Sequence, residues 1–169
     1  MNVRTTSLRT YTLPAAGWAI LGGFLGTLAF SVLMFASPMM GLPPMDLPTI
    51  LGTMFTTNMS LAFAVGLVMH FFVGSVVLAL VYAYFFRDAL RGPSGLRGAT
   101  YAFGVWVVAM AVVFPMMDIV HPLVVSGMMK GPGFFASSMG PMVAVGVLIG
   151  HLVYGAVLGS VAGARGSHP

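Results

Sequence analysis

Two histidines stand inside long apolar runs, and each is followed by a glycine one helical turn later. His70 and Gly74 lie in the stretch MHFFVG, and His151 and Gly155 lie in HLVYG. Residues at i and i+4 share one face of a helix, so a glycine there leaves space beside the imidazole. Two imidazoles can hold the iron of a haem b in the core of a helical bundle. The pattern therefore predicts a haem site, with His70 and His151 as iron ligands and Gly74 and Gly155 beside the flat ring.

The same residues also suit helix packing without any cofactor. Small residues four apart let membrane helices approach closely, and a neutral histidine can hydrogen-bond to a neighbouring helix. Gly66 and Gly74 flank His70 at this spacing, and Gly159 follows Gly155. No basic residue stands near either histidine to pair with the propionates of a haem. A structural role and a cofactor role both stay open for the two histidines.

The second group of candidate ligands lies in the segments between the apolar runs. Thioether sulfur suits Cu(I), and imidazole suits several metals. The chain has 15 methionines, but methionine is also a flexible apolar filler, and no tight run of Met and His fixes a ligand set. The candidate copper ligands are Met39, Met40, Met116, Met117 and His121.

Three polar residues of the same segments have possible roles other than copper binding. Asp46, which precedes Leu47 and Pro48, predicts the N-cap of a short helix on the outer membrane interface. Asp118 and His121 are three apart and can share a helical face. Such a pair is typical of a proton-active site, a contact with a quinone head group, or a solvated loop.

The elements that must position these residues are membrane spans. Hydrophobic residues make up 59% of the 169-residue chain, charged residues 6%, and the mean hydropathy is +1.01. A soluble domain carries roughly 25% charged residues, so the composition predicts an all-α membrane protein of one domain. A span needs about 20 apolar residues. Runs of this kind predict a four-transmembrane-helix bundle with spans at about 13–36, 59–86, 99–117 and 141–162.

Charge placement predicts the orientation of the spans. Basic residues concentrate in cytoplasmic loops. Six of the seven basic residues fall on one side of the predicted spans, and Lys130 alone falls on the other; the six are Arg4, Arg9, Arg87, Arg91, Arg97 and Arg165. We therefore expect a bacterial inner membrane protein with both termini in the cytoplasm.

An internal repeat relates the two halves of the chain. Pro38-Met39-Met40 follows the first span as Pro115-Met116-Met117 follows the third, and the His/Gly pairs recur in the second and fourth spans. The chain is thus interpreted as two repeated helix hairpins, which are related by an axis along the membrane normal. Spans two and four then run parallel, and their histidines lie at one depth.

Motifs of soluble enzymes are missing from the sequence. No phosphate-binding, dinucleotide or hydrolase signature occurs, and three acidic residues leave little for general acid–base catalysis. The absence of cysteine excludes disulfides and thiolate metal sites. We expect neither an enzyme nor a nucleic-acid partner.

Four stretches, GGFLGTLAFSVLM, MHFFVGSVVLALVYA, GLRGATYAFGVWV and GHLVYGAVLGSVAG, resemble a family of uncharacterised small bacterial membrane proteins with four spans. The resemblance implies the fold and the membrane location, and it assigns no activity.

The leading functional hypothesis is a non-catalytic integral membrane subunit or accessory factor of a larger assembly, such as a respiratory one. Its neighbours would be lipid and either other subunits or further copies of itself. The alternative is a small b-type cytochrome that passes electrons from quinol through a haem between His70 and His151. A further alternative is copper handling on the periplasmic side.

Overall fold

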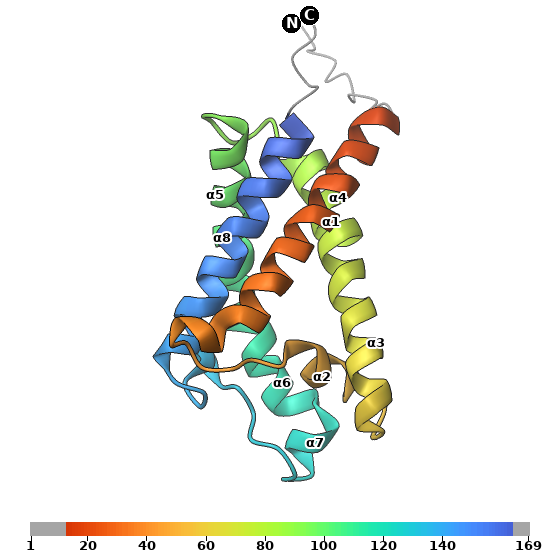
Figure 1. Cartoon of the computed structure of the whole chain (residues 1–169), viewed down its shortest axis with the longest axis vertical. Coiled ribbons are helices and arrows are strands. Elements are labelled where there is room, and N and C mark those ends of the chain that lie inside the picture. The colour runs from red at the N-terminus through yellow and green to blue at the C-terminus, as the bar shows by residue number, and fades with distance from the viewer. Residues whose placement is uncertain (1–12, 164–169) are drawn as a thin grey trace, which may run out of the picture.

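The computed structural model describes residues 13–163, which contain helices and no strand. Four helices are long and apolar enough to cross a membrane (Figure 1). They are called spans 1 to 4 below. The first and last described residues, Leu13 and Gly163, lie at one end of the bundle (Figure 1). This end is called the terminal end, and the opposite one the loop end.

Spans 1 and 4 are regular α-helices. Span 1 is α1, Leu13–Ala36, and span 4 is α8, Pro141–Gly163. Neither helix contains a charged residue, so neither has a polar face that must reach water. Their bounds agree with the predicted 13–36 and 141–162. Helix α1 passes into a 3₁₀ turn at Ser37–Met40, which Gly41 ends with a left-handed φ of 75°.

Spans 2 and 3 are continuous helices that include π-helical turns. Span 2 comprises α3 (Met59–Phe72), a π-turn (Val73–Leu78), α4 (Ala79–Val81) and a second π-turn (Tyr82–Phe86). Span 3 comprises α5 (Ser94–Val108), a π-turn (Ala109–Val113) and α6 (Phe114–Val120). A π-turn widens the helix by one residue and is frequent at functional sites.

Span 3 is longer than the predicted 99–117. The helix begins at Ser94, so Arg97 belongs to its first turn instead of to the preceding loop. The guanidinium of Arg97 donates from Nη1 to the backbone oxygen of Arg87 at 2.9 Å. This bond keeps the charge at the terminal end while the helix runs past it.

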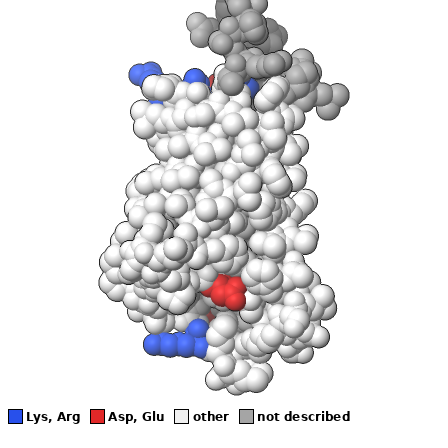
Figure 2. Space-filling view, viewed as in Figure 1, with Lys and Arg blue, Asp and Glu red and all other residues white. Residues whose placement is uncertain are grey.

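Charged groups lie at the two ends of the molecule, and an uncharged belt separates them (Figure 2). Arg87, Arg91 and Arg97 belong to the connection at the terminal end. Lys130 lies in the segment between spans 3 and 4, at the loop end. Arg4, Arg9 and Arg165, on which the predicted orientation also depends, lie outside the described residues.

Glycines bring α8 into close contact with both α1 and α5. A Cβ added at Gly22 of α1 would lie 2.9 Å from the carbonyl oxygen of Leu158, and one at Gly150 would lie 2.6 Å from the ring of Phe30. On the α5 side, an added Cβ at Gly98 would fall on the carbonyl oxygen of Gly155. These close approaches make α8 the central helix of the bundle.

The loop end carries short helices, of which α2, Leu47–Gly52, matters most for the site. Asp46 Oδ1 accepts a hydrogen bond from the backbone N–H of Thr49 at 3.0 Å, so the predicted N-cap is confirmed. The helix packs closely against α3, where Gly66 meets the carbonyl oxygen of Pro48. Pro48 and Gly52 of this helix are buried. The helix was expected to lie on the outer membrane interface, but one side of it is packed against protein. The other short helices are α7, Pro122–Val125, and a 3₁₀ turn, Phe134–Ala136.

Candidate functional site

A cavity of about 350 Å³ lies between the four spans, and its wall contains both span histidines. This cavity is called the chamber. Its volume falls within the range of small-molecule sites, and apart from the imidazoles and the groups of Thr27 and Tyr154 its lining is apolar. No residue of the lining carries a charge. The lining comprises Thr27, Phe30, Met45, Leu47, Leu51, Met69, His70, Val73, Gly74, Leu78, Val105, Val108, Ala109, Val113, Phe114, Met117, Val147, His151 and Tyr154.

Two tyrosine hydroxyls tie span 2 to its neighbours on the terminal-end side of the histidines. Tyr154 of α8 donates to the carbonyl oxygen of Gly74 at 2.7 Å, and Tyr101 of α5 donates to that of Leu78 at 2.9 Å. Both acceptors belong to the first π-turn of span 2. Buried carbonyl groups need partners, and the tyrosines supply them where the helix is irregular. The sequence analysis missed both tyrosines, although a tyrosine inside an apolar run signals a hydroxyl that must find an acceptor.

The imidazole of His151 is held by its own helix. Its Nδ1 lies 2.8 Å from the carbonyl oxygen of Val147. A carbonyl oxygen only accepts hydrogen bonds, so Nδ1 carries a proton. The other ring nitrogen, Nε2, makes no hydrogen bond within the described residues.

The imidazole of His70 has a different environment. Its Nε2 is buried and has no hydrogen-bond partner. The ring of Phe30, from α1, contacts both imidazoles, with centroid distances of 5.5 Å to His70 and 5.2 Å to His151. The two histidines therefore border the same part of the chamber and lie at one level of the bundle.

The predicted space beside Gly74 and Gly155 is filled by protein. A Cβ added at Gly74 would fall on Oγ1 of Thr27, and one at Gly155 would fall on the carbonyl oxygen of Gly98. Each glycine thus serves a close contact with the span that precedes it in the chain. At these two positions the glycines allow close helix packing, and neither leaves room for a porphyrin in this arrangement.

Spans 2 and 3 each contribute a π-turn to the wall of the chamber, and the sequence analysis predicted neither turn. Val73, Gly74 and Leu78 contribute from span 2, and Ala109 and Val113 contribute from span 3. Hydropathy patterns do not distinguish a π-turn from an α-helix. No signal in this single sequence marks these turns beforehand.

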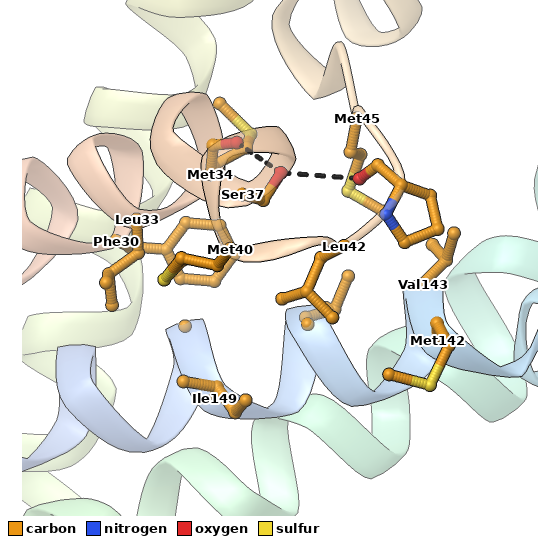
Figure 3. Close-up of a pocket in the computed structure, with 14 residues that line it drawn as sticks. Phe30, Leu33, Met34, Ser37, Met40, Leu42, Met45, Met142, Val143 and Ile149 are labelled. Atoms are coloured by element: carbon orange, nitrogen blue, oxygen red, sulfur yellow. Dashed lines mark hydrogen bonds between the residues drawn. The ribbon is translucent and has the colours of Figure 1, made fainter.

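The candidate copper ligands are distributed over several places. Met39 is 90% exposed, and Met116 is exposed as well. Met117 is buried and lines the chamber, whereas Met40 lines a separate cavity of about 100 Å³ between the ends of α1 and α8. Figure 3 shows Met34, Met45 and Met142 around this second cavity, together with Met40. Ser37 closes the turn beside it by donating to the backbone oxygens of Met34, at 2.8 Å, and Pro43, at 3.3 Å.

His121, the fifth candidate copper ligand, is fully buried at the loop end. Its Nδ1 accepts from the backbone N–H of Leu123 at 3.3 Å, and its Nε2 lies 3.0 Å from the carbonyl oxygen of Ile50 and 3.2 Å from Thr53 Oγ1. Nε2 thus holds α2 against the end of α6, and Nδ1 caps the first turn of α7. Copper handling stays a prediction that this arrangement does not favour.

Asp118 does not pair with His121. Its Oδ1 accepts from the backbone N–H of Gly133 at 3.2 Å and so fastens the long loop-end segment to α6. Within residues 13–163 there is also no group of three or more His, Asp or Glu side chains placed to hold a metal ion. Asp118 and His121 therefore serve structural contacts at the loop end.

A family model matches most of the chain. The model of a family of unknown function, DUF6789, covers residues 14–169. The resemblance to an uncharacterised family is thereby confirmed at that level. No curated protein and no solved structure matches the chain.

Proposed function

The chain belongs to the DUF6789 family of unknown function, and we propose that it is a non-catalytic membrane protein whose chamber holds an uncharged lipophilic molecule. In this role it serves as an accessory factor or subunit of a larger assembly in the bacterial inner membrane. The molecule would be presented to a partner, because the chain itself supplies few groups for catalysis.

The chamber is the observation that carries the proposal. It is large enough for a small molecule, its lining has no charged residue, and both span histidines belong to that lining. Ligand sites are typically apolar cavities with a few polar groups that fix the orientation of the ligand. Ionisable residues within a membrane span are functional candidates by default. An uncharged ligand follows from the lining, since a buried charge needs a partner of opposite sign.

The proposal also includes the orientation of the chain in the membrane and the origin of its two hairpins. The basic residues of the terminal end support a cytoplasmic location for both termini. The two hairpins also make equivalent close contacts: Gly74 packs on Thr27 of span 1, and Gly155 packs on Gly98 of span 3. This likeness supports descent from one repeated hairpin. Since the chain has no cysteine, single introduced cysteines at the two ends provide a direct labelling test of orientation.

A b-type cytochrome is the second candidate function. The observation that favours it is that both imidazoles line the same chamber and contact the ring of Phe30. Haem would supply one-electron chemistry, with His70 and His151 as its holders. No basic residue lines the chamber to pair with the propionates, and the spaces beside Gly74 and Gly155 are filled. These two facts favour an uncharged ligand over haem.

The test compares protein purified in mild detergent with variants that fill the chamber. Ala109→Phe fills it from span 3, and Val73→Phe fills it from span 2, because both residues belong to its lining. Gly104→Phe is the matched control, since no atom lies within 4 Å of a Cβ added there. We expect organic extraction and mass spectrometry to find a lipophilic molecule in near-equimolar amount in wild type and control, and to find it depleted in both filled variants.

Equal amounts in all four proteins, or none in the wild type, would contradict the proposal. Size-exclusion profiles confirm that the variants remain folded. A visible spectrum of the same samples tests the cytochrome alternative. Protein from haem-replete cells that shows a Soret band, lost in His70→Ala and His151→Ala, would establish haem as the ligand instead.

A further inference from the structure

The proton on His151 Nδ1 determines what its other nitrogen can do. Because Nδ1 donates to the carbonyl oxygen of Val147 at 2.8 Å, Nε2 of the neutral imidazole has a lone pair and no proton. The chamber lining holds no carboxylate that would stabilise a doubly protonated ring. His151 therefore offers the chamber a hydrogen-bond acceptor and needs a donor from whatever occupies it.

His70 borders the same part of the chamber without offering a matching group. Both imidazole rings contact the ring of Phe30. Nε2 of His70 is buried without a partner, so a molecule in the chamber does not reach that nitrogen in this arrangement. The polar group that a ligand meets here is therefore the acceptor of His151.

A hydroxyl supplies the donor that Nε2 of His151 lacks. A ketone or ester oxygen only accepts, so it would leave Nε2 of His151 without a donor. A carboxylate or phosphate would bring a charge that no residue of the lining neutralises. The remainder of the lining is aliphatic, aromatic or thioether, which favours an apolar body attached to the hydroxyl.

We propose that the chamber binds a lipophilic alcohol or phenol through its hydroxyl group, which donates to Nε2 of His151. This inference rests on the proposed function and names the ligand class of the same site. A hydroquinone head group and a long-chain alkanol share this chemistry. The two sources are separated by experiment.

The test measures binding of matched probes to the full-length protein in nanodiscs by isothermal titration calorimetry. One pair is decylhydroquinone and its dimethyl ether, and the other is dodecanol and dodecyl methyl ether. Methylation removes the donated proton and keeps the apolar body. We expect the hydroxyl member of at least one pair to bind about tenfold more tightly than its ether, since the ether leaves His151 Nε2 unsatisfied.

Variants then assign the preference to His151. His151→Phe should reduce the hydroxyl-to-ether preference to about twofold or less. His151→Gln should retain it, because its amide oxygen still accepts near the position of Nε2. Phe72→Leu, on the exposed face of α3 and outside the chamber lining, is the control and should keep the wild-type preference.

The outcomes separate the two proposals. A preference in the hydroquinone pair alone identifies a phenol site, and one in the alkanol pair alone identifies an alcohol site. Ethers that bind as tightly as their hydroxyl partners would overturn the hydroxyl assignment while leaving a lipophilic site in place. Failure of all four probes to bind the wild type, combined with the absence of any extracted lipophile, would overturn the proposed function itself. The wild-type ratio needs no variant, so a misfolded variant does not weaken the test.

Discussion

His70 and His151 occupy matching positions in two similar sequences, but the helices that carry them are built differently. Span 4 is α-helical from Pro141 to Gly163 and packs between α1 and α5. Span 2 changes to a π-turn at Val73, shortly after its histidine. Nδ1 of His151 is hydrogen-bonded to the carbonyl oxygen of Val147 in the same helix, whereas Nε2 of His70 has no hydrogen-bond partner.

The difference indicates two roles within one site. Span 4 provides a fixed acceptor because its helix and its imidazole are both held in place. Span 2 provides an adaptable wall, since a π-turn leaves carbonyls that Tyr154 and Tyr101 must satisfy. A matching sequence pattern is thus compatible with unequal mechanical roles in the two hairpins.

The largest expected effect compares the two glycines. At Gly155 an added Cβ meets the backbone of Gly98, which cannot rotate away, while at Gly74 it meets the Thr27 side chain. We expect Gly155→Ala to lower the free energy of unfolding by about 3 kcal/mol and Gly74→Ala to lower it by about 1 kcal/mol. Reversible unfolding in mixed micelles measures both values.

Two further variants control this comparison. Gly104→Ala should be nearly neutral, because the space around Gly104 is open. Adding Thr27→Ala should restore part of the loss in Gly74→Ala and none of the loss in Gly155→Ala. Equal losses at the two glycines would show that spans 2 and 4 are equally fixed.

The next effect separates the histidines by role. His121 is fully buried, holds α2 through Nε2 and caps α7 through Nδ1, so His121→Ala should lower the free energy of unfolding by about 2 kcal/mol. His70→Ala breaks no hydrogen bond of the ring Nε2 and should change stability by less than about 1 kcal/mol. The same unfolding assay, made after removal of extractable ligand, gives both numbers. A larger loss for His70→Ala would mark His70 as a structural residue.

The smallest effect concerns the tyrosines. Tyr154→Phe leaves the carbonyl of Gly74 without its hydroxyl donor, and Tyr101→Phe does the same at Leu78. We expect losses of about 1 kcal/mol for each, in the upper range of hydrogen bonds between membrane helices. Hydrogen exchange of the span 2 amides should rise in both variants and stay unchanged in span 4. Faster exchange in span 4 instead would reverse the assignment of fixed and adaptable walls.

Composition was sufficient to predict four spans, because uncharged apolar runs of this length have few other solutions. The bounds of α1 and of span 2 followed from where such runs end at Pro38 and Arg87. Span 3 was predicted too short because Arg97 was assigned to a loop, whereas its side chain reaches back to Arg87. The capping role of Asp46 was also predictable, since it depends on local sequence only.

The site was only partly predictable. The pairing of His70 with His151 was inferred from repeat spacing, and both do line one chamber. What fills the space beside Gly74 and Gly155 depends on neighbouring spans, as does the gathering of Met34 and Met142 with Met40. Neither the π-turns nor the tyrosine bonds are encoded in hydropathy. These features arise from tertiary packing, which a single sequence does not specify.

The most direct test of the central claim is the ¹⁵N NMR spectrum of histidine-labelled protein in nanodiscs, recorded with and without decylhydroquinone and dodecanol. The account predicts that at least one probe shifts the Nε2 resonance of His151, while the resonances of His121 stay in place. Single His→Gln variants assign the signals. An unchanged Nε2 resonance at His151, or an equal shift at His121, would contradict a ligand site in the chamber beside His151.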